Sequence, residues 1–202
     1  MTDRPANGGP GSRSLFDVVQ SAIQGGVDMV QLREKNLATR EWLDLAMELA
    51  QLCRKHKVYF IVNDRVDIAC ASGADGVHLG QDDFPVKLAR KILGKNKIIG
   101  KSTHSLEEAR KSAREDVDYI AVGPIFWTTT KKIEPAAGGV GPELITQVRK
   151  FVKKPILGIG GIKPENAALV RTAGATGVAV VSALMTASDI AETAVQFRKA
   201  LD

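Results

Sequence analysis

Short apolar runs alternate with amphipathic segments along most of this 202-residue sequence. Between Ser14 and Gln24 apolar residues recur at helical spacing, and residues 58–62 are wholly apolar, as expected for a parallel strand covered on both faces. Strands are predicted at residues 28–32, 58–62, 76–79, 97–100, 119–122, 155–158 and 177–181. Helices are predicted at residues 14–24, 39–56, 66–72, 85–93, 105–114, 142–151, 164–172 and 187–201, with Thr39 as the cap of the second.

Strands that alternate with helices indicate βα units and a parallel sheet. Residues 26–32 also resemble residues 73–79, 116–122 and 174–180, which forms a degenerate internal repeat. Such a repeat is expected of a (β/α)8 TIM-type barrel, in which alternate strands fill the same packing layers. A doubly wound open sheet is the alternative fold, and it gives no reason for the repeat.

The predicted elements number eight helices and seven strands, so one strand is missing before the first helix. Met1–Arg4 leaves no room for that strand. We therefore expect a barrel that lacks most or all of its first β-strand and is open at this seam, or a true start upstream. The expected organisation is a flexible N-terminal segment, 1–13, followed by a single barrel domain, 14–202.

Composition adds a weak preference for an anionic ligand, since the net charge is +5. The basic residues are spread along the chain and aromatic residues make up only 5%, which argues against a nucleic-acid partner. No run approaches the roughly 20 apolar residues of a membrane span, and the N-terminus lacks the apolar core of a signal peptide. Cys53 and Cys70 lie in apolar helical patterns and are predicted to be buried hydrophobic residues in a reducing compartment. The expected location is the cytoplasm.

Polar residues follow the predicted strands at the end where barrels bind ligands. The first strand leads into Gln31, Arg33 and Lys35, which share a face because alternate residues of an extended chain point the same way. Two cations and an amide in a row can hold an anion of pyrophosphate size. The alternative is a strand that ends in solvated charges.

The next two strands lead into acidic residues. Asn63 and Asp64 follow one strand and Asp83 follows the next, so the two carboxylates are expected on adjacent loops. Carboxylates of this kind suit Mg²⁺ that is bound partly through phosphate oxygens. The alternative is an Asn-Asp turn and a helix cap, which need no metal.

The later strand ends point to a second anion site. Ser102 and His104 follow the fourth strand, and a long glycine-rich loop containing Lys131 has the composition of a lid. The glycines of residues 158–162 and the serine at 182 occupy the usual phosphate site of barrels. His104 is more often structural at such a position, and His78 is expected in the core. Two anion sites favour transfer of a group from pyrophosphate to a phosphate-bearing acceptor.

Together these motifs resemble the thiamine phosphate synthase family from about Thr2 to the C-terminus. The matching stretches are 31–35 (Gln-x-Arg-x-Lys), 63–67, 76–83, 102–104, 123–126, 128–131, 158–162 and 180–183. The resemblance implies an enzyme that joins 4-amino-2-methyl-5-hydroxymethylpyrimidine diphosphate to 4-methyl-5-(2-phosphoethyl)thiazole, or its carboxylated tautomer. Thiamine phosphate and pyrophosphate are the implied products.

The resemblance also implies a role for individual residues. The pyrimidine diphosphate would be bound by Gln31, Arg33, Lys35, Asn63, Ser102 and Lys131. The thiazole phosphate would be bound by Thr128, Thr130, Gly161, Val181 and Ser182. Asp64 and Asp83 would hold Mg²⁺, and catalysis would rest on Arg33, Lys35, Ser102 and Lys131.

In this family the pyrophosphate departs first and the thiazole nitrogen captures the resulting cation, so no general base is needed. The implied partners are small phosphorylated pyrimidine and thiazole substrates, without nucleic acid or membrane, and the oligomeric state is open, a homo-oligomer included. Two alternatives remain. One is a thiazole tautomerase paralogue, which would not need the pyrophosphate and Mg²⁺ residues. The other is a non-catalytic barrel that binds a phosphate ligand.

Overall fold

The computed structural model describes residues 1–2, 13–128 and 139–202. Within them, one sheet contains seven parallel strands in the order of the sequence. The strands are β1 (Met29–Leu32), β2 (Tyr59–Asn63), β3 (Gly76–Leu79), β4 (Ile98–Thr103), β5 (Tyr119–Val122), β6 (Ile156–Ile159) and β7 (Gly177–Ala179). A doubly wound sheet would reverse its strand order, so the sequential order excludes that alternative. The TIM-type fold is confirmed as a curled sheet.

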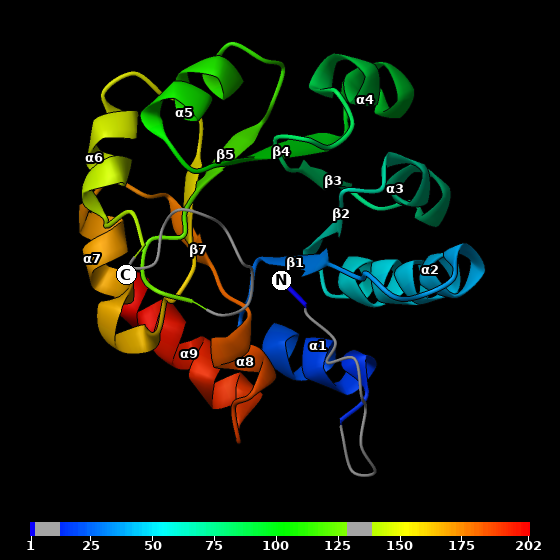
Figure 1. Cartoon of the computed structure of the whole chain (residues 1–202). Helices are drawn as coiled ribbons and strands as arrows, with labels where there is room; N and C mark the ends of the chain where they lie inside the picture. Colours follow the sequence, from blue (N-terminus) through cyan, green and yellow to red (C-terminus); the bar gives the residue numbers. More distant parts are fainter. Residues whose placement is uncertain (3–12, 129–138) are drawn as a thin grey trace.

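Helices connect the strands and lie around the outer side of the sheet (Figure 1). They are α1 (Leu15–Gln24), α2 (Thr39–Lys55), α3 (Val66–Ser72), α4 (Val86–Leu93), α5 (Leu106–Ala113), α6 (Glu143–Arg149), α7 (Pro164–Thr172), α8 (Ser182–Met185) and α9 (Ile190–Leu201). Ser14 caps α1 by accepting a hydrogen bond from the Asp17 amide. The prediction that Thr39 caps α2 is wrong, because the helix already begins at that residue and Ala38 occupies the cap position. The four-residue α8 was not predicted, since one turn shows no periodicity.

Strand alternation separates the hydrophobic core from the interior of the curled sheet. One set of alternate residues, including Leu32, Val62 and Leu79, is fully buried in the main hydrophobic cluster. The other set contains polar residues such as Asn63 and His78, which are buried yet line a cavity. The sequence of each strand therefore builds the core on one face and supplies functional groups on the other.

The strands β1 and β7 are the two edges of the sheet in the described part of the chain. Beside β1, the Thr2 amide donates to the Gln31 carbonyl at 2.8 Å. The Met1 amino group donates to the carbonyl of Val180, just after β7, at 3.0 Å. The start of the chain thus lies at the seam where a strand was expected to be missing (Figure 1). Residues 3–12, most of the segment predicted to be flexible, lie outside the described residues.

The two cysteines differ in environment. Cys53 on α2 is fully buried, whereas Cys70 on α3 is exposed, and both are free. The prediction that both are buried is wrong for Cys70, because α3 turns its neighbours Ile68 and Ala69 toward the core instead. No helix in the described ranges has the length and apolarity that crossing a membrane requires.

We expect a thiol reagent to modify Cys70 and to spare Cys53 in the native protein. Burial, with a smaller effect from Asp75, raises the pKa of Cys53 to about 12, so its thiolate is scarce at pH 8. Mass spectrometry after labelling at pH 8 should find one adduct in the native protein and two in urea. The Cys70→Ser variant should give none before unfolding, and an adduct on native Cys53 would contradict the assignment.

Candidate functional site

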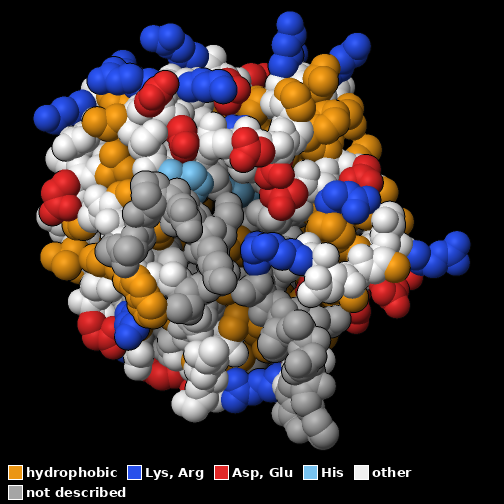
Figure 2. All heavy atoms as spheres, in the orientation of Figure 1, with side chains coloured by type: hydrophobic (Ala, Val, Ile, Leu, Met, Phe, Trp, Pro, Cys, Tyr) orange, Lys and Arg blue, Asp and Glu red, His pale blue; other side chains and the backbone are white. Residues whose placement is uncertain are grey.

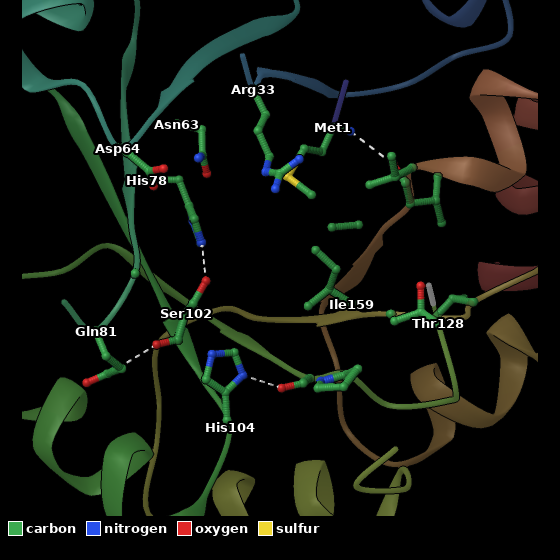
Figure 3. Close-up of a pocket in the computed structure, with 18 of the residues that line it drawn as sticks. Met1, Arg33, Asn63, Asp64, His78, Gln81, Ser102, His104, Thr128 and Ile159 are labelled. Carbon is green, nitrogen blue, oxygen red and sulfur yellow. Dashed lines mark hydrogen bonds between the residues drawn. The ribbon is translucent and has the colours of Figure 1, made fainter. Parts of the chain in front are cut away.

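A cavity of about 530 Å³ opens at the carboxyl ends of the strands. The segments that follow all seven strands contribute to its lining. Acidic and histidine side chains gather around the hollow at the centre of this face (Figure 2). Figure 3 shows how the side chains converge on the space from opposite sides.

One wall of the cavity carries the predicted anion-binding residues that follow β1. Arg33 is only 6% exposed, and Lys35 is exposed at the rim. The Arg33 amide donates to the Thr2 hydroxyl at 3.0 Å, which fixes the chain where the arginine enters the cavity. Gln31 does not line the cavity, because it lies two residues deeper in the same inward row and is buried. The structure thus brings Arg33 and Lys35 together and places Gln31 beneath them.

The predicted metal ligands, Asp64 and Asp83, both line the cavity. Asp64 adopts a left-handed backbone (φ 63°), a conformation that Asp tolerates better than most residues, and its amide donates to the His78 carbonyl at 2.8 Å. The carboxylate of Asp83 accepts from the Gly80 amide at 2.6 Å. The described residues contain no cluster of three or more metal-ligating side chains. A pair of carboxylates fits Mg²⁺, which commonly takes one or two carboxylates and completes its shell with water and phosphate oxygens.

Two histidines border the middle of the cavity. His104 contacts the Gly123 carbonyl through Nδ1 at 2.5 Å, and its amide donates to the Glu108 carboxylate at 2.7 Å. His78 contacts Ser102 Oγ through Nε2 at 2.8 Å. His78 is buried, as expected from the sequence, with 5% of its surface exposed, and it also lines the cavity. Its place in the inward row, two residues before Gly80, was the signal available in the sequence.

The opposite wall contains the glycine-rich turn after β6 and the chain after β7. Gly161 has a positive φ (63°), and a Cβ there would lie 2.4 Å from the Trp127 carbonyl oxygen. Thr128, Val181 and Ser182 line the same side of the cavity. Asn166 holds the turn by donating to the Gly161 carbonyl at 3.2 Å. The remaining two predicted residues, Thr130 and Lys131, lie outside the described residues.

The family model for thiamine monophosphate synthase matches residues 2–184 of this chain. The chain belongs to the thiamine monophosphate synthase family. It is 50% identical to the thiamine-phosphate synthase of Chloroflexus aurantiacus over 92% of this chain and 85% of that protein. It is 47% identical to the thiamine-phosphate synthase of Syntrophomonas wolfei over 98% of this chain and 93% of that protein. The thiamine phosphate pyrophosphorylase structure from Pyrococcus furiosus superimposes with a TM-score of 0.87, at 38% identity, over 99% of this chain and 92% of that one.

In this member of the thiamine monophosphate synthase family, a glycine on β4 makes room for two of the rings beside the cavity. A Cβ at Gly100 would lie 2.1 Å from Tyr119 Cζ and 2.5 Å from His78 Nδ1. Both rings are buried, so neither can move aside without disturbing its neighbours.

We expect Gly100→Ala to lower the free energy of unfolding by about 1–3 kcal/mol, the usual cost of overpacking. Urea unfolding followed by circular dichroism measures the change. Gly177→Ala on β7 is the matched control, since a Cβ there would meet its nearest neighbour, Leu157, at an ordinary 3.4 Å. Equal losses in the two variants would show that the rings do not require the glycine.

Proposed function

We propose that this chain joins 4-amino-2-methyl-5-hydroxymethylpyrimidine diphosphate to 4-methyl-5-(2-phosphoethyl)thiazole, or to its carboxylated tautomer. The products are thiamine phosphate and pyrophosphate, and the reaction takes place in the cytoplasm. The observation that carries this proposal is one cavity with two different walls. Arg33, Lys35 and a carboxylate pair stand on one wall, and a glycine-rich turn with Ser182 stands on the other.

The wall after β1–β3 takes the diphosphate end of the pyrimidine substrate. Arg33 and Lys35 supply positive charge, and Asn63 and Ser102 supply hydrogen bonds from adjacent strand ends. Asp64 and Asp83 hold Mg²⁺, which when bound neutralises charge on the diphosphate. Lys131 is assigned to the same substrate by the family motif. The buried position of Arg33 favours a strong interaction, because little water screens its charge.

The opposite wall takes the phosphate of the thiazole substrate. The Gly160–Gly161 turn, with both residues at positive φ, allows the backbone to approach a ligand closely. Thr128 and Ser182 offer hydroxyl groups at the same wall, and Val181 and Thr130 complete the set by family motif.

The reaction proceeds by departure of the leaving group before bond formation. The C–O bond to pyrophosphate breaks with its electron pair, and negative charge grows where Arg33 and Lys35 stand. The thiazole nitrogen then forms the new C–N bond to the pyrimidine-methyl cation with its own lone pair. This nitrogen carries no proton to remove, so the site needs no general base. The cavity instead holds both substrates and limits the access of water to the cation.

We expect the protein to release pyrophosphate only when both substrates and Mg²⁺ are present. Arg33→Ala and Asp64→Ala should each lower kcat/KM by about 100-fold or more. The first removes a positive charge beside the leaving group, and the second removes a ligand of the Mg²⁺ that would offset its charge. A coupled pyrophosphate assay measures the rate. Lys95→Ala, an exposed lysine in the loop before β4 at the opposite end of the sheet, is the control and should keep full activity.

Full activity in the Arg33 and Asp64 variants would overturn the assignment of the wall. Tautomerisation of the carboxylated thiazole without pyrophosphate release would instead support the paralogue function. Binding of the thiazole phosphate with neither reaction would support a non-catalytic barrel.

We expect Mg²⁺ to strengthen the binding of inorganic pyrophosphate to the free protein, because Asp64 and Asp83 would hold the ion and its charge would offset that of the ligand. Asp64→Asn and Asp83→Asn should each reduce this gain by about tenfold or more, as measured by titration calorimetry with Mg²⁺ and with EDTA. Asp44→Asn, an exposed carboxylate on α2, should leave the gain unchanged. Pyrophosphate affinity that is the same with and without Mg²⁺ would contradict a metal site here.

A further inference from the structure

A row of side chains connects the interior of the sheet to Ser102. The register of β3, β4 and β5 sets His78 beside Gly100 and Gly100 beside Tyr119. The Tyr119 hydroxyl lies 2.8 Å from His78 Nδ1, and His78 Nε2 lies 2.8 Å from Ser102 Oγ. The two rings stack with centroids 5.5 Å apart and planes 26° apart. Figure 3 shows His78 reaching Ser102 at the edge of the cavity.

The Gln31 side chain, at the inner end of the row, determines which groups donate and which accept in these hydrogen bonds. A side-chain hydrogen bond from Gln31 lowers the pKa of Tyr119, which is the effect of a donor to the tyrosine oxygen. The Oε1 atom of Gln31 has no hydrogen-bond partner among the described residues, which leaves its amide nitrogen as the donor. Burial raises the pKa of Tyr119 well above its ordinary value, and the Gln31 contact offsets only part of that rise. Tyr119 therefore keeps its proton and donates it.

The acceptor for the Tyr119 proton is His78 Nδ1, the acceptor that lies at hydrogen-bonding distance in the described residues. A neutral histidine whose Nδ1 accepts carries its proton on Nε2, which then donates to Ser102 Oγ. Since that oxygen already accepts from His78, the Ser102 proton must point elsewhere. The open direction leads into the cavity that Ser102 lines.

We propose that Tyr119 and His78 are positioning residues that fix Ser102 as a hydrogen-bond donor to the pyrimidine diphosphate. The inference rests on the proposed function for the identity of the ligand. Ser102 touches the substrate, whereas the two rings act through it. The group that receives the proton is an acceptor atom of the substrate, and no proton leaves Ser102 during the reaction.

The absence of a side chain at Gly100 allows the Tyr119 and His78 rings to lie in this arrangement. A side chain at this position would overlap both rings, since a Cβ would lie 2.4 Å from the Tyr119 hydroxyl oxygen and 2.5 Å from His78 Nδ1. A second contact holds Ser102 from another direction, because the Gln81 side-chain amide donates to its carbonyl at 2.5 Å. Both the backbone and the hydroxyl of Ser102 are thus held by side chains.

A double-mutant cycle tests the proposal through kcat for pyrophosphate release. Tyr119→Phe keeps the ring and removes the hydroxyl, and it should lower kcat by about tenfold while the KM for the thiazole phosphate stays unchanged. In the Ser102→Ala background the same change should alter kcat by less than about twofold, because the group on which it acts is gone. Tyr59→Phe is the matched control, since Tyr59 is the other tyrosine of the chain and is 55% exposed.

Two substitutions of His78 provide a second test of the proposal. His78→Gln places an amide N–H donor toward Ser102 and should retain more activity than His78→Leu, which has no donor. Multiplicative losses for the Tyr119 and Ser102 changes, or equal losses in the two His78 variants, would overturn the proposal in favour of a purely structural role.

Nitrogen NMR of ¹⁵N-histidine-labelled protein determines the tautomer of His78 and requires no activity assay. His78 should carry its proton on Nε2 in the unmodified protein, and Tyr119→Phe should produce a mixture of tautomers. A proton on Nδ1 in the unmodified protein would overturn the proposal. Absence of pyrophosphate release from the unmodified protein would refute the proposed function, whereas an active protein with the wrong tautomer would refute only this inference.

Discussion

The site depends on one constraint, the two-residue alternation of side chains along the parallel strands. Each strand must place apolar residues against the outer helices, which leaves the alternate positions facing the interior of the curled sheet. Groups buried there need partners, since a polar atom without a hydrogen bond costs free energy. The Tyr119 hydroxyl and the two ring nitrogens of His78 meet this requirement through bonds to each other and to Ser102 Oγ. The packing that stabilises the fold therefore also orients the functional groups.

In the proposed function, the two walls of the cavity would hold their anions by different physical means. Arg33 brings a full charge into a poorly solvated place, where electrostatic interactions are strong. The Gly160–Gly161 turn brings no charge and relies on close approach of the backbone. A pyrophosphate leaving group, which gains negative charge as its bond breaks, suits the first wall, and a phosphate that only anchors its substrate suits the second. The asymmetry agrees with bond breaking at one end of the cavity and binding alone at the other.

Much of this arrangement was predictable from sequence because strand ends in a barrel converge on one face. The bounds of β3 and β5 agree with the prediction, and most of the predicted site residues line one cavity. The depth of a residue within its inward row was not predictable from local pattern, which is why Gln31 lies beneath the cavity and His78 reaches it. Exposure on a short helix was equally hard to predict. In α3, only the tertiary packing shows that Cys70 faces outward.

The direction of the hydrogen bonds bears on the reaction itself. A serine that donates into the cavity can stabilise negative charge on a departing group, but a serine that acts as a base would need to accept a proton there. The Gln31–Tyr119–His78 row directs the Ser102 proton toward the ligand and occupies its oxygen from behind. A reaction in which the leaving group departs first needs donors of this kind and no base. The buried network and the dissociative reaction therefore both require the Ser102 hydroxyl to act as a hydrogen-bond donor toward the ligand.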